Sequence, residues 1–135
     1  MTQDFPKPEK LKSRKLIGQL FAEGKSISRF PLRLVYMPVV LPPGIRFQVG
    51  VSASKRNFRK AVSRNRIKRL LREAYRLNKH ILEEGHKGGY AFMLLYQHRE
   101  MPDFEQVNRK MQQLLHLFLE KEAAAAGVKN TTDDV

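Results

Sequence analysis

The sequence contains no cysteine, few acidic residues and no long apolar run. Without cysteine there are no disulfides, no thiolate metal site and no cysteine nucleophile, a composition that fits a reducing cytosol. No apolar run approaches the roughly 18 residues of a membrane span. The first 15 residues, MTQDFPKPEKLKSRK, lack the apolar segment of a secretory signal. We therefore expect a cytoplasmic protein that does not bind membranes.

Catalytic patterns are also missing from the sequence. The four histidines are scattered, and none has a histidine or cysteine four residues away, as a zinc site on a helix would require. No serine has an evident base nearby in the sequence, and no motif of a nucleophilic hydrolase occurs. This argues against self-contained catalysis. It leaves open a subunit of an enzyme whose chemistry resides in another component.

The shortage of acids leaves a large excess of positive charge. The 135 residues include 26 Lys and Arg against 13 Asp and Glu, a formal net charge of +13. In a protein without an export signal, this points first to nucleic acid, with anionic membranes or acidic proteins a distant second. The 41% hydrophobic content argues against global disorder, and the length suits one domain with a real core.

Most of the excess charge lies in residues 54–79, SKRNFRKAVSRNRIKRLLREAYRLNK, which hold 11 Lys and Arg and one acid, Glu73. Helical spacing of about 100° per residue places a cationic stripe opposite an apolar one, with Arg64 and Arg66 flanking the cationic side. A charge run is often only a solvated face, but such faces normally mix signs, because like charges one turn apart repel. A polyanion-binding helix is therefore favoured. The cationic stripe is Asn65, Lys68, Arg69, Arg72, Arg76 and Lys79; the apolar one is Ile67, Leu70, Leu71, Ala74, Leu77 and Ile81.

The other segments predict a small α+β domain. Residues 11–23 have helical spacing and end at Gly24, whereas residues 30–38 and 45–53 alternate like two strands of an antiparallel hairpin. One face of this hairpin is polar and small, which makes a plausible groove beside the basic helix. Residues 90–96 are apolar on both faces and predict a central strand, and a last helix follows Asp103. We expect a flexible segment at 1–10, one domain at 11–120, and a helix end with a frayed tail at 121–135.

One motif resembles a known family. The string SRNRIKRLLREA at residues 63–74 resembles the signature of the bacterial ribonuclease P protein component, in which an Arg-Asn-Arg triplet opens an RNA-contacting helix. The string VGVSASKR at residues 49–56 and Phe21 with EGKS at residues 23–26 agree in order and spacing. The resemblance covers about residues 11–118.

The resemblance implies a fold and a function. The fold would be a two-layer α-β sandwich shared with a small-subunit ribosomal protein, in which the basic helix forms a left-handed β-α-β crossover, against the usual right-handed rule. The enzyme removes the 5′ leader from precursor tRNA, and its RNA subunit holds most of the catalytic Mg²⁺ and carries out the hydrolysis. The protein, as a monomer, would bind ribonuclease P RNA and hold the leader between the sheet and the first helix.

Site residues follow from the same resemblance. It implies leader-cleft positions at Phe21 and Ser52, whereas Ile17 stands where the family commonly has an aromatic residue. A cleft-facing tyrosine is usual on the second strand; strand parity puts Val35 there and turns Tyr36 toward the core. From helical spacing alone, Phe21 is equally an ordinary core residue. The implied contacts to the catalytic RNA are Lys55, Arg56, Arg64, Asn65, Arg66, Lys68, Arg69 and Arg72.

Two other functions compete with this one. A ribosomal or ribosome-assembly RNA-binding protein without an enzyme role would have the same net charge and the same kind of basic helix. A DNA-binding protein would be supported by a helix-turn-helix pair or by dimer symmetry, and neither is visible in the sequence. The Arg-Asn-Arg signature and the polar sheet face favour the ribonuclease P subunit.

Overall fold

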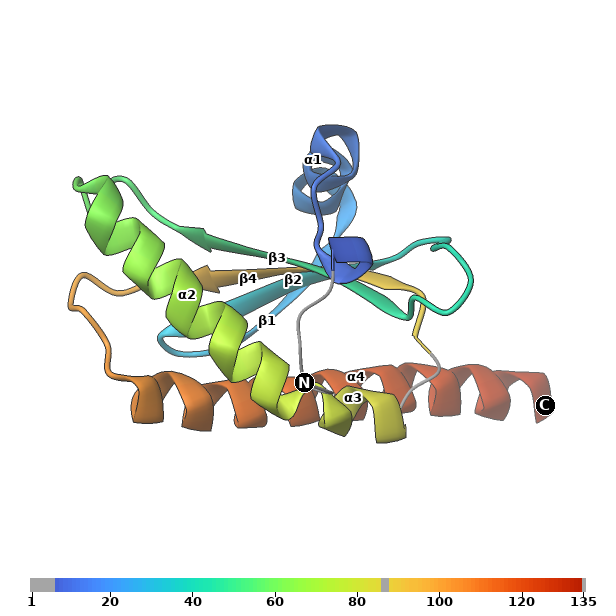
Figure 1. Ribbon diagram of the computed structural model, residues 1–135. Helices are drawn as coiled ribbons and strands as arrows, with labels where there is room; N and C mark the ends of the chain where they lie inside the picture. Colours follow the sequence, from blue (N-terminus) through green and yellow to red (C-terminus); the bar gives the residue numbers. More distant parts are fainter. Residues whose placement is uncertain (1–6, 86–87, 135) are drawn as a thin grey trace.

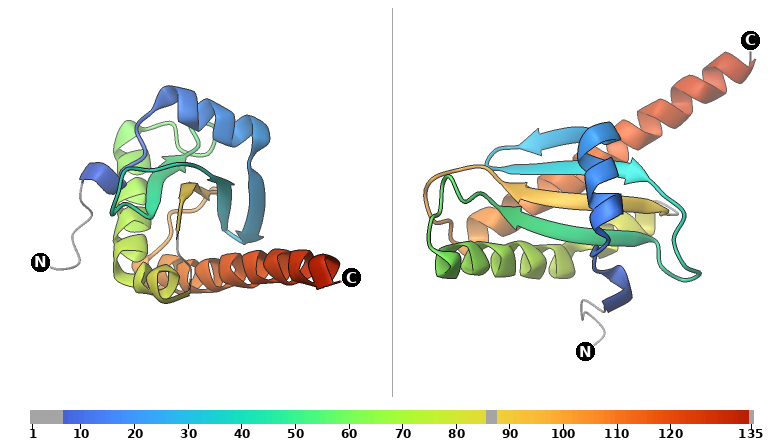
Figure 2. Two further views of the ribbon diagram at one scale, coloured as in Figure 1. Left: turned by 90° about the vertical axis from the view of Figure 1, so that its right-hand side faces the viewer. Right: turned by 90° about the horizontal axis from the view of Figure 1, so that it is seen from above.

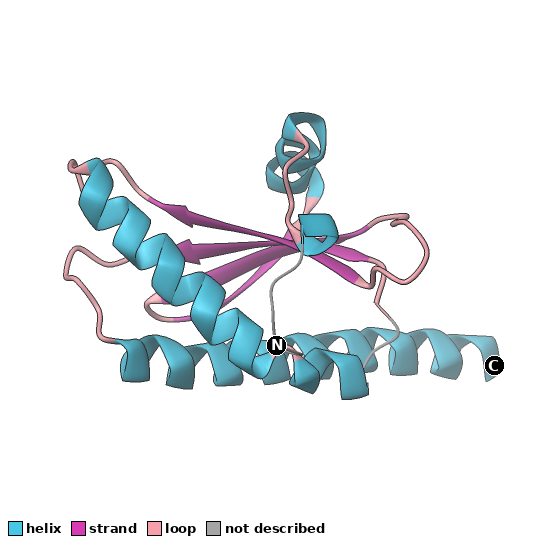
Figure 3. Ribbon diagram, in the orientation of Figure 1, coloured by secondary structure: helices cyan, strands magenta, loops and turns pink. Residues whose placement is uncertain are grey.

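The computed structural model describes residues 7–85 and 88–134 of the chain, which form one four-stranded sheet with helices (Figures 1 and 3). The strand order across the sheet is β1-β2-β4-β3. The strands are β1 (Lys25–Arg29), β2 (Leu32–Pro38), β3 (Phe47–Ala53) and β4 (Tyr90–Tyr96). The helices are the 3-10 helix η1 (Lys7–Glu9), α1 (Arg14–Glu23), α2 (Ala61–Asn78), α3 (His80–Gly85) and α4 (Phe104–Asp134).

The predicted hairpin between residues 30–38 and 45–53 is wrong, because β4 lies between β2 and β3. Met93 of β4 pairs with Val35 on antiparallel β2 and with Gly50 on parallel β3. The physical reason is the composition of β4, YAFMLLY, which is apolar on both faces and needs a neighbour on each side and a cover on each face.

β2 forms its hairpin with β1 instead, a strand that sequence patterning missed. The β1 sequence, KSISR, has one apolar residue and shows no buried face, since only Ile27 is even partly buried. Polar residues of this kind are typical of an edge strand, where they discourage pairing with other chains.

The connection from β3 through α2 to β4 is left-handed, as the resemblance implied. β3 and β4 are parallel neighbours, and α2 crosses the face of the sheet opposite to α1. Seen from the α2 side with the strands pointing upward, β4 lies to the left of β3 (Figures 1 and 2). The usual rule would have placed it on the right.

The predicted α+β sandwich is confirmed, with helices on both faces of the sheet. The main core lies between the sheet and α2, α3 and α4; it includes Leu34 and Tyr36 of β2 and Phe118 of α4. A smaller core lies on the opposite face beneath α1, which runs across the strands rather than along them (Figure 2). None of the helices in the described ranges has the length and apolarity that crossing a bilayer would demand.

Both ends of the described chain have secondary structure. Residues 7–10 were expected to be flexible, but η1 lies there, Lys10 forms a β-bridge with Val49, and Gln48 Nε2 donates to the Pro8 carbonyl at 3.1 Å. These contacts connect the segment before α1 to the edge strand β3. At the other end, α4 continues to Asp134, where the polar tail was expected to fray. Residues 1–6 and 135 lie outside the described residues.

Candidate nucleic-acid interface

The apolar face of α2 anchors the helix on β3 and α4. Ile67, Leu71 and Ala74 are completely buried, which confirms that side of the predicted stripe. Tyr75 is buried as well, although the sequence analysis did not assign it to the stripe, and burial raises the pKa of its phenol. The helix therefore has little freedom to rotate, and its opposite face has a fixed orientation.

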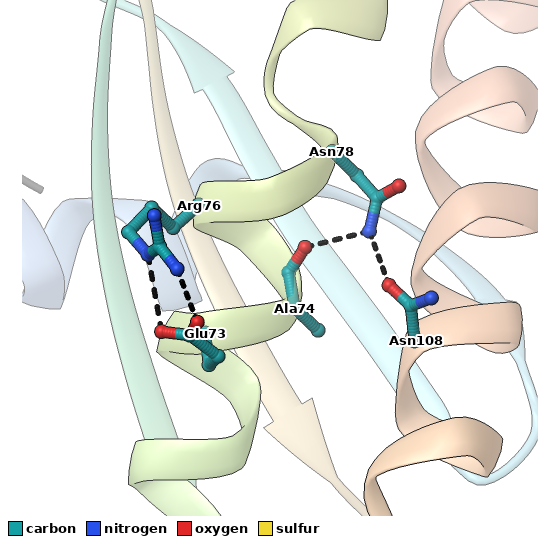
Figure 4. Close-up of polar contacts among 5 residues, drawn as sticks. All are labelled: Glu73, Ala74, Arg76, Asn78 and Asn108. Carbon is teal, nitrogen blue, oxygen red and sulfur yellow. Dashed lines mark hydrogen bonds and ion pairs between the residues drawn. The ribbon is translucent and has the colours of Figure 1, made fainter. Parts of the chain in front are cut away.

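A buried polar contact joins α2 to α4 near the end of α2 (Figure 4). The side-chain amide of Asn78 donates to its own helix at the Ala74 carbonyl, 2.7 Å away, and to Asn108 Oδ1 on α4, 2.6 Å away. Gln112 of α4 donates back to Asn78 Oδ1 at 3.1 Å. Because each partner has its own hydrogen-bond requirement, this network fixes the register of the two helices. The polar Asn78 was not singled out in the sequence.

The cationic face of α2 is exposed in its N-terminal two-thirds. Asn65, Arg66, Arg69 and Arg72 are exposed and Lys68 is partly buried. Within the described ranges, none of the four cations in this group forms an ion pair. They repel one another, and a polyanion would relieve that repulsion.

The last turn of α2 is different, because acids neutralise its cations. Arg76 forms a two-point ion pair with Glu73, and this hydrogen bonding lowers the pKa of the Glu73 carboxyl (Figure 4). Lys79 forms an ion pair with Glu9 at 3.3 Å, which also fixes η1 against α2. The unneutralised charge is thus concentrated toward the start of the helix, although sequence spacing placed all six residues on one stripe.

The loop before α2 is held by one of the predicted RNA contacts. Arg64 donates from one guanidinium nitrogen to the carbonyl oxygens of Phe58 and Arg59, at 2.9 and 2.8 Å. The Phe58 ring is buried against Tyr96 of β4, at a centroid distance of 6.1 Å. The loop cations Lys55 and Arg56 are exposed beside α2. Arg64 therefore positions the loop, whereas Lys55 and Arg56 are exposed to a ligand.

A second surface is formed by α1 and the sheet face beneath it. Val35 does face α1, as strand parity predicted, and Tyr36 faces α4. However, Val35 is only 4% exposed, since it packs under the helix, and so it offers little surface to a leader. Gly24, which ends α1, permits this packing: a Cβ there would lie 2.4 Å from the Leu20 carbonyl oxygen and 3.0 Å from Val35 Cγ1.

Phe21 is 52% exposed, so the helix anchors itself with its neighbour Leu20, which is completely buried. Phe21 is therefore not an ordinary core residue. Ile17 is partly buried against the small core and contributes an apolar edge. Helical spacing could not predict which of Leu20 and Phe21 is buried. Both lie on the apolar stripe, and only the position of the sheet decides which side chain it covers.

α1 leaves one row of the sheet face uncovered. The register aligns Arg33 of β2 with Leu95 of β4 and Leu95 with Ser52 of β3, and all three residues are partly exposed. The guanidinium of Arg33 donates to Ser26 Oγ of β1 at 3.2 Å. Arg33 was not predicted as a site residue from the sequence, although it is a lone charge in a strand of mostly apolar residues.

Metal ligands do not come together in the described residues: no group of three His, Asp or Glu side chains is placed to hold an ion. Glu73 of the basic helix and Glu9 of η1 are paired with cations. This donor set does not fit a Mg²⁺ site.

Comparisons with known proteins agree on one family. A family model for ribonuclease P matches residues 5–118. The ribonuclease P protein component of Porphyromonas gingivalis is 44% identical over 119 residues, spanning 84% of this chain and 85% of the relative. The Chlorobaculum tepidum protein of the same name is 36% identical over 110 residues, spanning 76% and 71%.

Solved structures agree as well. The ribonuclease P protein of Thermotoga maritima matches with a TM-score of 0.64 and 26% identity, over 79% of this chain and 94% of that one. The Staphylococcus aureus protein matches with a TM-score of 0.62 over 81% and 94%, and at 20% identity this match supports the fold alone.

Proposed function

Because the chain belongs to the ribonuclease P protein family, and so is a protein subunit of that tRNA-processing ribonucleoprotein, we propose that its two surfaces bind two different RNAs. The cationic face of α2 binds the catalytic RNA of the enzyme. The sheet row beside α1 binds the single-stranded 5′ leader of precursor tRNA.

The composition of α2 supports the first assignment. Arginine guanidinium groups suit phosphates, because each can donate two parallel hydrogen bonds to one group. Arg66, Arg69 and Arg72 are exposed, without ion pairs in the described ranges, on a helix whose buried face is fixed by packing. A rigid row of charges suits a folded RNA, whose phosphates are themselves held in place. Lys55 and Arg56 extend the row into the preceding loop.

The chemistry of the α1 surface supports the second assignment. A leader varies in sequence, so its recognition should rely on stacking and charge rather than on base-edge hydrogen bonds. Phe21 offers an exposed ring, Arg33 a cation and Ser52 a small polar side chain. Ile17 contributes an apolar contact. Few of these groups could distinguish one base from another by hydrogen bonds, so the surface suits a substrate of variable sequence.

In this proposal the protein supplies binding and the RNA subunit supplies the chemistry. The catalytic Mg²⁺ is bound mainly by the RNA subunit, as the family resemblance implies. The protein lowers the free energy of the precursor complex by neutralising phosphates and by holding the leader away from the tRNA body. We assign it to the cytoplasm, as a monomer within the holoenzyme.

One observation carries the proposal: cations that form no ion pair within the described ranges and an exposed aromatic ring lie on separate elements, α2 and α1. The test is 5′-leader cleavage by a bacterial ribonuclease P RNA at low Mg²⁺, with RNA alone, protein alone and both. We expect cleavage only with both. Tight, salt-sensitive RNA binding without stimulated cleavage would favour the alternative of a ribosomal or assembly protein.

A further inference from the structure

A second aromatic site lies at the end of the sheet, away from α1. It is a pocket of about 250 Å³ between the turn that joins β1 to β2, the loop that joins β4 to α4, and the first turns of α4. In Figure 1 these segments lie at the left-hand end of the sheet, the end where the loop before α2 also lies. The lining includes Phe30, Tyr96, His98, Met101, Arg109 and Lys110.

The pocket gathers apolar surface that a folded chain normally hides. Phe30 is 62% exposed and Met101 is 37% exposed, so two of the five exposed large hydrophobic side chains in the described ranges line this one pocket. The Phe30 ring lies beside the imidazole of His98, with a centroid distance of 5.3 Å and an interplanar angle of 51°. An exposed ring in such a setting offers a stacking face to a flat ligand.

The rim of the pocket is cationic. Arg109 is exposed and Lys110 is partly buried, and both project from α4. The single acid in the lining is Glu100, whose carboxylate lies 3.7 Å from His98 Nε2. One acid against two cations favours an anionic ligand, and a ring beside two cations suits a base with its phosphate.

The backbone around the pocket is fixed. The Tyr96 hydroxyl donates to the Glu100 carbonyl at 2.7 Å, and the Gln97 N–H donates to the Pro31 carbonyl at 2.8 Å. These two bonds connect the β4–α4 loop to β4 and to the β1–β2 turn. The stacking face is therefore positioned before any ligand arrives, which reduces the entropy cost of binding.

The pocket lies around the end of the sheet from the open row. Leu32 pairs with Tyr96 on the α4 face, and the next pair along the same strands, Arg33 with Leu95, belongs to the row on the α1 face. A strand of RNA that crosses the row toward the β1–β2 turn meets Phe30 as it leaves the sheet.

We propose that this pocket binds an unpaired base of the leader, upstream of the part held beside α1, by stacking on Phe30 and by contacts from Arg109 and Lys110 to its phosphate. The inference rests on the proposed function, because it assumes that a leader crosses the sheet face. It adds a binding site for a distal nucleotide and a reason for affinity to depend on leader length.

The experiment uses the reconstituted holoenzyme and precursor tRNAs whose leaders are lengthened one nucleotide at a time. For Phe30→Ala, we expect the affinity for long leaders to fall about tenfold, while the affinity for short leaders and for mature tRNA is unchanged. Val40→Ala is the matched control, because Val40 is a fully exposed apolar residue in the loop between β2 and β3. It should change no affinity.

A 2-aminopurine base placed at successive leader positions gives an independent readout. Its fluorescence should be quenched at one distal position, and Phe30→Ala but not Val40→Ala should relieve the quenching. Equal losses for long leaders and for mature tRNA, or no position that responds to Phe30, would overturn the inference. A failure of the proposed function is a separate result, because wild-type protein would then not stimulate cleavage of any precursor.

Discussion

At the scale of single residues, the structure separates neighbours that the sequence treats alike. Leu20 and Phe21 both lie on the apolar stripe of α1, yet Leu20 is buried and Phe21 is half exposed. Arg64 and Arg66 are the two arginines of the Arg-Asn-Arg motif, yet Arg64 is bonded to loop carbonyls and Arg66 is exposed. Mutations at these two pairs therefore test which residues stabilise the fold and which bind RNA.

We expect Phe21→Ala to leave the fold intact and to weaken the affinity of the holoenzyme for precursor tRNA more than for mature tRNA, because the proposed function assigns the lost ring to a leader contact. Leu20→Ala should instead lower the free energy of unfolding by about 2–5 kcal/mol, since it opens a cavity under α1. Chemical denaturation and equilibrium binding give the two quantities. An equal loss of affinity for both tRNAs with Phe21→Ala would count against a leader contact.

We expect Arg64→Ala to lower the free energy of unfolding by about 1–2 kcal/mol, because two carbonyl oxygens lose a charged donor. Arg66→Ala should change it by less than about 0.5 kcal/mol, as is usual for an exposed side chain. Thermal unfolding of the two variants in the same buffer compares them. Equal stabilities would mean that the bonds of Arg64 do not hold the loop.

At the scale of elements, the sequence predicts those helices and strands whose own composition determines which face is buried. It does not predict features that depend on distant parts of the chain. The amphipathic α2 and the apolar β4 were predicted correctly, because their own composition determines which face they bury. The pairing of β2 with β4 was not, because alternation along a strand shows its faces and says nothing about its neighbours. The edge strand β1 buries almost nothing and so has no hydrophobic signal.

The candidate site divides in the same way. The exposure of Asn65, Arg66, Arg69 and Arg72 agrees with helical spacing. The pairing of Lys79 with Glu9 depends on tertiary contacts between segments 70 residues apart, which spacing cannot show. The left-handed crossover came only from the family resemblance, since general rules favour the other hand.

For α2 as a unit, we expect the double change Arg66→Ala with Arg69→Ala to weaken binding to the catalytic RNA and to reduce its salt dependence. The slope of log K against log salt should fall by roughly 1.4–1.8, the contribution of two phosphate contacts at about 0.7–0.9 each. Binding titrations at several salt concentrations measure it.

A matched control removes two exposed lysines from other elements, Lys25 of β1 and Lys121 of α4. We expect this pair to change the slope much less. The same slope for wild type and the α2 double variant would remove the helix from the interface. The same fall in both variants would make net charge, rather than the face of α2, responsible for binding.

At the scale of the whole molecule, the sheet separates the two proposed RNA surfaces. α1 and the open row lie on one face, whereas α2 lies across the other face beside α4 (Figure 2). The left-handed crossover passes α2 along this second face while β4 stays central, buried on both sides. In the proposed function, this arrangement allows one small chain to bind a large structured RNA and a single strand at the same time.

The measurement that tests this account most directly uses the absence of cysteine. One cysteine introduced at Val62 on α2, at Ser28 on β1 beside the open row, or at Gln113 on α4 gives a unique attachment point for an iron chelate that generates hydroxyl radicals. All three residues are exposed, and Gln113 lies on a helix of the face opposite to α1.

In the holoenzyme with bound precursor tRNA, we predict that the probe at Val62 cleaves the catalytic RNA and the probe at Ser28 cleaves the leader. The probe at Gln113, one turn of α4 from Arg109, should cleave the catalytic RNA weakly and the leader only at its distal, pocket-bound end. Strong cleavage of the catalytic RNA from Ser28, or of the leader from Val62, would contradict the assignment of the two surfaces.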